Sequence, residues 1–294
     1  MDNKGLTLSI IFEAESANYG EGVGNVTALK KISRGDHETY TYISRQALRY
    51  NIVQQMNADN TPVGLDKTVL QFHPEAMIDK YPEIDLFGYM KTSKTTKTRS
   101  AVARLSNAVA LESYNTDLEF LTNKGLLDRY MKAENKAGDE IKGGNIAQSE
   151  IHKSFYAYTI TIDLDKIGID ENDNIEIPLP ERAKRVNNLL QTIKFLYRDI
   201  KGRRENLSPI FAIGGVYSIK NPFFENRLKL DSNRLLVDTI LSVIEFDNHI
   251  KENTCVGLVK GILSNDQEIV EKLNAKAMAE LFAKLESEVN AYYQ

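Results

Sequence analysis

Two arginines four residues apart give the strongest chemical signal in the sequence. Arg45 and Arg49 lie in the segment from Gly24 to Ile52, which has five basic and two acidic residues, although the whole chain has a net charge of −4. Like charges at this helical spacing repel each other by roughly a few tenths of a kcal/mol unless an anion lies between them. The pair therefore predicts a bound phosphate, and a nucleic-acid backbone is the first partner to consider.

The residues before these arginines extend the predicted anion site. Ser44 is a suitable N-cap for a helix that runs to about Gln55. The free N–H groups and the positive dipole end of a helix start favour an anion. Lys30 and Lys31 precede this helix start and add two cations to the same segment.

A second basic segment spans residues 91–100 and reads as a low-complexity loop. No acidic residue occurs from Thr92 through Leu111, and the interleaved Thr and Ser hydroxyls suit phosphate oxygens. The cations of this segment and its surroundings are Lys91, Lys94, Lys97, Arg99 and Arg104. Two such patches together predict RNA or DNA binding.

Patterns for catalysis are weaker. Asp163 and Asp165 follow a predicted strand and are either a metal-binding pair or a strand end that turns into solvent. Asp36, next to His37, either assists RNA cleavage or forms a turn. The four histidines have no metal-ligand spacing, and Cys255 reads as a small buried hydrophobe. We therefore predict no catalytic residues, no metal and no cofactor.

Length and composition indicate an ordinary cytoplasmic protein. A chain of 294 residues with 42% hydrophobic and 27% charged residues can bury a sizeable core. No apolar run approaches the roughly 18 residues that span a bilayer, and the N-terminus lacks a signal-peptide layout. A single cysteine cannot form an internal disulfide.

Hydrophobic periodicity predicts two strand–helix–strand units. Leu6 to Phe12 alternates as a strand with one buried face, and the helix from Ser44 follows it. Phe155 to Leu164 predicts a second strand, and Glu181 to Asp199 a second helix. Ile210 to Ser218 predicts the strand after that helix. This order is typical of an α+β, RRM-like (ferredoxin-like) fold.

Long insertions elaborate this predicted single domain of residues 1–294. Residues 56–100 contain three prolines and predict an inserted, finger-like region, while residues 124–153 are polar and predict a protruding, thumb-like loop or hairpin. Gly214-Gly215 indicates either a close backbone approach or a β-bulge. Two helices, near Glu268–Leu273 and Ala275–Tyr292, are expected to close the chain.

Several runs of sequence resemble the DevR-type CRISPR-associated proteins, the repeated backbone subunits of type I Cascade surveillance complexes. The block Ser44-Arg-Gln-Ala-Leu-Arg49 is the most specific part of the resemblance. The other matching runs are Gly24-Asn-Val26, Lys30-Lys-Ile32, Arg99-Ser-Ala-Val-Ala103, Val109-Ala-Leu-Glu-Ser-Tyr114, Ser154 to Leu164 and Phe211 to Ser218. Together they extend over most of residues 5–230.

The resemblance implies an RRM-like palm with finger and thumb regions, and copies that stack along the spacer part of a CRISPR RNA in a helical filament. The implied partners are CRISPR RNA, target DNA through the guide, neighbouring copies and other Cascade subunits of a complex of subtype I-B. The RNA-contacting candidates carried over are Asn25, Lys30, Lys31, Ser44, Arg45, Gln46 and Arg49. Lys91, Lys94, Lys97 and Arg99 of the second patch join them.

Two alternatives stay open. Related type III backbone subunits cut target RNA with a loop aspartate, so the first alternative is a metal-dependent endoribonuclease that uses Asp36. The second is a regulator that binds RNA or DNA as a free dimer.

Overall fold

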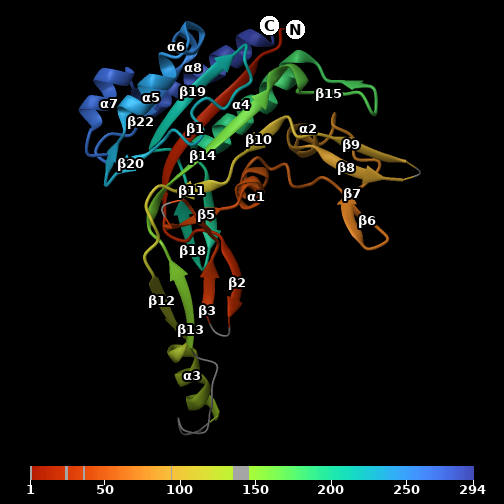
Figure 1. Ribbon diagram of the computed structural model, residues 1–294. Coiled ribbons are helices and arrows are strands. Elements are labelled where there is room, and N and C mark those ends of the chain that lie inside the picture. Colours follow the sequence, from red (N-terminus) through yellow and green to blue (C-terminus); the bar gives the residue numbers. More distant parts are fainter. Residues whose placement is uncertain (1, 24–25, 36, 94, 135–145) are drawn as a thin grey trace.

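A nine-stranded sheet forms the centre of the computed structural model, which describes residues 2–23, 26–35, 37–93, 95–134 and 146–294 (Figure 1). Within these residues the strands lie in the order β23 (Lys276–Ala277), β22 (Cys255–Leu258), β19 (Phe211–Tyr217), β1 (Gly5–Ala14), β14 (Ser154–Asp163), β11 (Ala108–Ala110), β5 (Thr39–Ile43) and β4 (Lys31–Ser33), with β10 (Ala103–Leu105) also paired to β14. β1 pairs antiparallel with both β14 and β19. The first strand of the chain is thus central.

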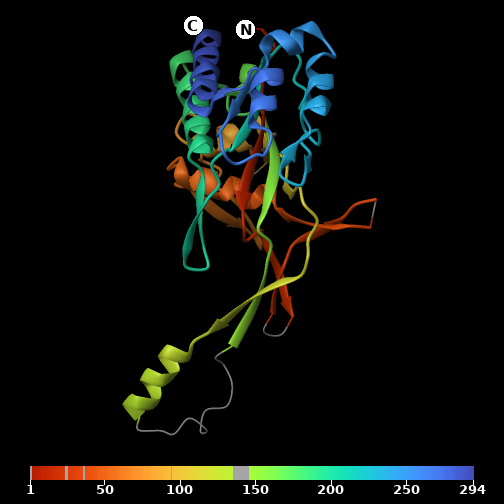
Figure 2. The same ribbon diagram turned by 90° about the vertical axis from the view of Figure 1, so that its left-hand side faces the viewer.

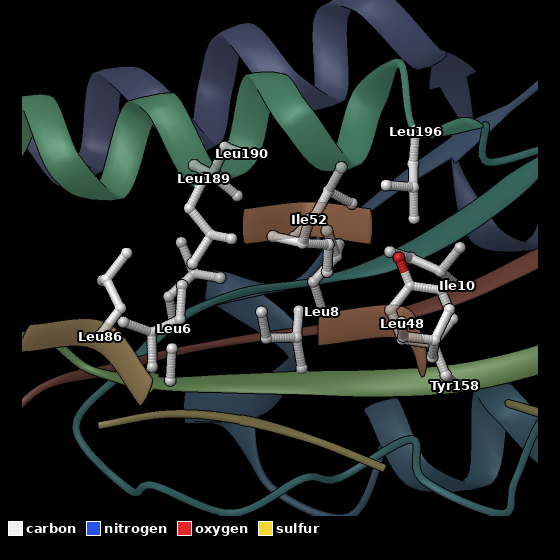
Figure 3. Packing of buried hydrophobic residues seen from close by; sticks show 14 of the residues in the cluster. Leu6, Leu8, Ile10, Leu48, Ile52, Leu86, Tyr158, Leu189, Leu190 and Leu196 are labelled. Carbon is white, nitrogen blue, oxygen red and sulfur yellow. The ribbon is translucent and has the colours of Figure 1, made fainter. Parts of the chain in front are cut away.

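Three helices cover one face of this sheet: α1 (Arg45–Gln55), α4 (Leu179–Lys194) and α8 (Met278–Tyr292). Leu6, Leu8 and Ile10 of β1 point to this face, where they join Leu48 and Ile52 of α1 (Figure 3). Leu189, Leu190 and the other apolar residues at helical spacing bring α4 onto the same core. The amphipathic patterns of α1 and α4 therefore dictate how both helices pack.

The opposite face of the sheet is also covered. Ile11, Phe211 and Ile213 pack there with apolar residues from the helices α5 (Val237–Ile244), α6 (Asn248–Asn253) and α7 (Asp266–Leu273). The prediction of one buried face for β1 was therefore wrong, because Thr7 and Ser9 are buried as well. Their burial is tolerated because the hydroxyls bond: Ser9 Oγ lies 2.6 Å from Thr159 Oγ1.

The glycine pair in β19 serves close approach. The register from Gly5↔Tyr217 to Ile11↔Phe211 is continuous, so β19 has no bulge here. A Cβ on Gly214 would lie 1.9 Å from the carbonyl oxygen of Thr7, and one on Gly215 would lie 1.9 Å from that of Asn253. Only glycine lets β19 pass between these two backbones.

Two groups of elements extend from the body (Figures 1 and 2). One projects far from the sheet and contains β12 (Asp117–Thr122), α3 (Lys124–Glu134) and β13 (Ile146–Ile151), with β2 (Tyr19–Val23) and β3 (Val26–Leu29) beside its base. The other contains β6 (Val63–Asp66), β7 (Val69–Phe72), α2 (Pro82–Phe87), β8 (Tyr89–Thr92) and β9 (Thr96–Arg99). We call the first group the projection.

Several predicted boundaries need correction. The second helix ends at Lys194 rather than at Asp199, because β17 (Tyr197–Ile200) pairs with β18 (Arg203–Asn206) in a hairpin. Residues 91–92 and 96–99, which were expected in a loop, are strand residues of the hairpin β8–β9. Further short hairpins pair β6 with β7, β15 (Ile169–Asp170) with β16 (Ile175–Glu176), and β20 (Leu230–Asp231) with β21 (Arg234–Leu235).

Candidate nucleic-acid interface

The start of α1 is fixed by two asparagines. Ser44 has the extended backbone of an N-cap, and its Oγ accepts a hydrogen bond from the N–H of Ala47 at 3.3 Å. The same hydroxyl donates to Oδ1 of Asn18 at 2.6 Å, and the N–H of Arg45 donates to Oδ1 of Asn107 at 2.9 Å. Ser44 is buried, so its hydroxyl caps the helix and its direct contact with RNA is not favoured.

The backbone of Asn18 also forms hydrogen bonds with β5 and with the residue between β3 and β4. Its N–H donates to the carbonyl of Tyr42, and its carbonyl accepts from the N–H of Lys30 at 2.7 Å. Lys30 is therefore held beside the start of α1, as its place in the predicted patch requires. Asn18 and Asn107 were missed from the sequence because an isolated asparagine in a loop shows no pattern.

Arg45 and Gln46 are exposed at the first turn of α1. With the described residues, the guanidinium of Arg45 makes no ion pair. An exposed cation at a helix start adds its charge to the positive end of the helix dipole. The charge at this end of α1 favours an anion, and the anion site stays a prediction.

Arg49 differs from Arg45. Its Nη2 lies 3.2 Å from Oε1 of Glu83 in the turn of α2, and its guanidinium stacks 5.1 Å from the ring of Phe87. Glu83 already offsets the repulsion between Arg49 and Arg45, so this repulsion by itself does not require a bound anion. About a third of the Arg49 side chain stays exposed, so one side of it remains open to solvent.

Lys31 lies where the central sheet meets the projection, and we call this contact region the joint. Its Nζ lies 2.7 Å from Oε1 of Glu150 in β13 and 4.4 Å from the centre of the Tyr114 ring. The ring of Tyr114 meets His152 edge-on, and Nδ1 of His152 lies 2.7 Å from Oγ1 of Thr41. Burial lowers the pKa of His152. The joint is a packed polar cluster, and the charge of Lys31 is used within it.

The second predicted patch is an internal ion-pair network. Nζ of Lys91 is buried, 2.7 Å from Oδ2 of Asp173, and Nζ of Lys97 lies 2.5 Å from Oδ1 of the same residue. Burial opposes ionisation of Asp173, but the hydrogen bonds from both lysines outweigh it and lower its pKa. Lys91 therefore has no accessible charge, and about two-fifths of the Lys97 side chain is exposed.

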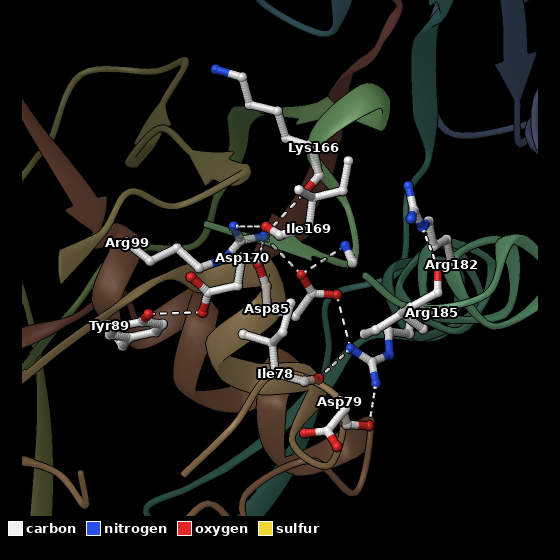
Figure 4. Close-up of polar contacts among 12 residues, drawn as sticks. Ile78, Asp79, Asp85, Tyr89, Arg99, Lys166, Ile169, Asp170, Arg182 and Arg185 are labelled. Atoms are coloured by element: carbon white, nitrogen blue, oxygen red, sulfur yellow. Dashed lines mark hydrogen bonds and ion pairs between the residues drawn. The ribbon is translucent and has the colours of Figure 1, made fainter. Parts of the chain in front are cut away.

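Arg99 is held in the same way by Asp85 (Figure 4). Asp85 is fully buried; its Oδ1 accepts from Arg99 at 2.8 Å and from the N–H of Gly168, and its Oδ2 accepts from Arg185 at 2.9 Å. These bonds tie α2 and the hairpin β8–β9 to α4. Burial and ion pairing thus disagree with the expectation that Lys91 and Arg99 offer phosphate contacts.

Arg104 completes the description of the second segment. Its Nη2 lies 2.9 Å from Oδ2 of Asp163, while Lys220 pairs with Asp165. Burial opposes the charge of Asp163, and the bond and charge of Arg104 with neighbouring lysines lower its pKa overall. The two aspartates are ion-paired to cations, which disfavours the metal-pair interpretation.

Three predicted positions, Asn25, Lys94 and Asp36, lie outside the described residues. In the described part of the chain, no group of three or more His, Cys, Asp or Glu side chains is placed to hold a metal ion. Cys255 is only partly buried where it packs against the core, and this burial raises the pKa of its thiol to about 12. Among the described residues, no helix is long and apolar enough to cross a membrane.

A groove of about 660 Å³ lies between β11, β14 and the segment around Phe224–Leu230. Asn107, which anchors Arg45, lines it. Arg34 forms one wall and lies 4.2 Å over the ring of Tyr40, and Lys229 lines it as well. The groove therefore carries two cations, one acidic residue, Glu225, and an aromatic ring, and Asn107 is its link to the start of α1. Of these, only Arg34 had a sequence signal, as a member of the basic segment.

Comparison with protein families decides what kind of protein this is. The family model described as "CRISPR-associated negative auto-regulator DevR/Csa2" matches residues 6–231. The chain belongs to this family. The DevR/Csa2 match extends from β1 through β20 and ends before α5. It confirms the family predicted from the sequence, whereas the subtype stays a prediction.

Solved structures resemble the DevR/Csa2 chain over nearly its whole length. One, described as "CRISPR RNA-guided surveillance complex, pre-nicking", has a TM-score of 0.66 and 10% identity, and covers 97% of this chain and 100% of that one. Another, "CRISPR RNA-guided surveillance complex", has a TM-score of 0.59 and 13% identity, over 98% and 99% of the two chains. No curated protein sequence matches significantly. The structural likeness shows a shared, mixed α+β fold, as predicted.

Proposed function

We propose that this chain is a non-catalytic, RNA-binding backbone subunit of a type I CRISPR surveillance complex. Copies of the chain follow the spacer part of a CRISPR RNA, hold its phosphates, and leave the bases free to pair with target DNA. Other Cascade subunits complete the assembly in the cytoplasm. The family match and the fold shared with chains of RNA-guided surveillance complexes support this role.

The observation that carries the proposal is the exposed start of α1. Arg45 and Gln46 stand at a capped helix start, and the open side of Arg49 follows one turn later. The backbone of Lys30 is held beside them through Asn18, and Asn107 links the N–H of Arg45 to the groove that Arg34 lines. This cationic surface recognises phosphate rather than base edges, so it suits a subunit that must hold any guide sequence.

The architecture supports the same role. β1 lies between β19 and β14, and β10 and β11 follow β14, an order that fits a split βαβ, RRM-like palm. We propose that residues 56–100 form its finger region. We further propose that the thumb region, expected at residues 124–153, includes β12 and begins at Asp117. Lys91 and Arg99 are left out of the RNA contacts because their charges are buried.

RNA-dependent assembly tests the proposal. The purified chain is sized with and without a CRISPR RNA, as wild type and as Arg45→Glu. We expect wild type to form RNA-length assemblies and Arg45→Glu to stay small, because the substitution places a negative charge in the phosphate path. Lys251→Glu, on the exposed side of α6, is the matched control and should assemble normally. Assembly that ignores RNA would contradict the proposal.

The same purified proteins also distinguish the two alternative functions, a free regulator and an endoribonuclease. The family description retains the words "negative auto-regulator", which favours testing a free regulator. A stable dimer that binds double-stranded DNA and does not grow on CRISPR RNA would support that role. Metal-dependent cuts in target RNA at regular spacing, abolished by Asp36→Ala, would support the endoribonuclease.

A further inference from the structure

A second groove, of about 650 Å³, lies between the second half of α1 and the end of α4. It shares no lining residue with the groove beside Asn107. Tyr50 and Phe195 line it, and 61% and 62% of these residues are exposed. Single exposed apolar residues are ordinary, but two large rings on one polar groove are a feature that a ligand can use.

The chemistry of the lining limits the ligand. Its charged residues are neutralised, since Arg198 pairs with Glu205 at 2.6 Å and Asp199 with Arg204 at 2.8 Å. Among the lining residues a phosphate or a metal ion therefore finds no unpaired charge; beside them, Nζ of Lys194 lies 5.2 Å from the centre of the Phe195 ring. The polar remainder is mostly side-chain amides, contributed by Asn51, Gln54, Gln55, Asn57 and Gln191. Gln55 bonds at both ends to Tyr197, and the amide nitrogens of Asn51 and Gln191 donate to Ala47 and Glu286, so the amide oxygens of Asn51 and Gln191 and the side chains of Gln54 and Asn57 face a ligand. Aromatic rings with amide donors and acceptors match a flat, neutral, hydrogen-bonding heterocycle, as a nucleobase is.

The groove is held in shape before any ligand binds. Gln55 Nε2 donates to the carbonyl oxygen of Tyr197 at 2.5 Å, and its Oε1 accepts from the N–H of Tyr197 at 3.2 Å. This pair of hydrogen bonds between α1 and β17 fixes the distance across the groove. A preformed site loses less free energy on binding than one that must be ordered.

The groove also continues the proposed RNA path. Gln46, Tyr50 and Gln54 are exposed and lie four residues apart, so they form one stripe on α1 with about 6 Å between successive members. A strand whose phosphates are held at Arg45 can follow this stripe to the groove. We infer that the groove between Tyr50 and Phe195 binds an unpaired base of that RNA strand; this rests on the proposed function.

Photocrosslinking tests the inference on the full chain. Single-stranded RNAs with one 5-iodouracil at successive positions are bound and irradiated, and the linked peptides are identified by mass spectrometry. We expect crosslinks to Tyr50 or Phe195. Bound RNA that links only to other residues, such as Tyr40, overturns the inference and leaves the proposed function standing. RNA that does not bind to wild type at all defeats both.

Binding by variants adds a second readout. Tyr50→Ala with Phe195→Ala should weaken RNA binding about tenfold, the usual effect of losing a stacked base. Phe246→Ala, which removes an 84% exposed ring on the other face, is the matched control and should bind as wild type. An abasic site at the crosslinked position should weaken binding to wild type but not to the double variant. Equal weakening of both proteins would refute base binding in this groove.

Discussion

The two basic regions of this chain have similar residues and opposite environments. At the start of α1, Arg45 is exposed and has no ion pair with the described residues. In the hairpin β8–β9, Lys91 and Arg99 face buried carboxylates of Asp173 and Asp85. Arg45 in the first region is available to a ligand, whereas Lys91 and Arg99 in the second hold the fold together. A basic run in a sequence therefore shows a ligand surface only once its acidic partners are located.

The largest difference should appear in stability. Asp85→Asn replaces the carboxylate that Arg99 and Arg185 share by a neutral amide. Because both guanidinium groups then stay buried without a counter-charge, we expect the free energy of unfolding to fall by about 3–5 kcal/mol. Urea denaturation followed by circular dichroism measures it. Asp199→Asn, which breaks an exposed pair, is the control and should change stability by about 1 kcal/mol or less. Similar losses in both variants would end the distinction between buried and exposed pairs.

The second-largest effect should be on RNA affinity, which we expect to depend on the start of α1 and not on the hairpin β8–β9. Arg45→Glu should weaken RNA affinity at least about tenfold near 0.15 M salt and reduce the slope of log affinity against log salt by about 1, since one phosphate contact is lost. Filter binding at several salt concentrations measures both quantities. An unchanged slope would mean that Arg45 contacts no phosphate.

Lys97 tests whether a partly exposed cation of the hairpin β8–β9 contributes to RNA binding. Lys97→Gln removes a partly exposed cation from Asp173 while Lys91 remains, so we expect RNA affinity to change less than twofold and stability by about 1 kcal/mol or less. The same filter-binding assay and urea titration serve. A loss of affinity as large as that of Arg45→Glu would restore the hairpin as an RNA surface.

The smallest effect should be the pH dependence of stability that Asp173 contributes. Because the folded-state pKa of Asp173 is lowered, its ion pairs stabilise the fold fully above the unfolded pKa of about 3.9 and lose this contribution as pH falls through the folded pKa. The stability difference between wild type and Asp173→Asn should thus be constant from pH 7 to 5 and shrink at lower pH. Thermal unfolding of both proteins follows it; a difference that grew on acidification would contradict the lowered pKa.

The same contrast explains what the sequence could predict. The helix from Ser44 to Gln55 was predicted because its cap and its apolar spacing are local. The neutralisation of Lys91 was not, because Asp173 lies 82 residues away and only the fold brings them together. The two asparagines that anchor α1 were missed for the same reason: Asn18 acts on Ser44 from 26 positions away and Asn107 on Arg45 from 62.

Gly214 and Gly215 restrict how this chain can evolve. Their missing side chains accommodate main-chain oxygens on two sides, one from β1 and one from the end of α6. Because both obstacles are backbone, no mutation of a neighbouring side chain can make room for even an alanine. The first obstacle lies inside the segment shared with the family and the second beyond it. The position of the end of α6 therefore restricts which residue the family segment can carry at 215. If both codons were randomised and the variants selected for folding alone, glycine should return at each position.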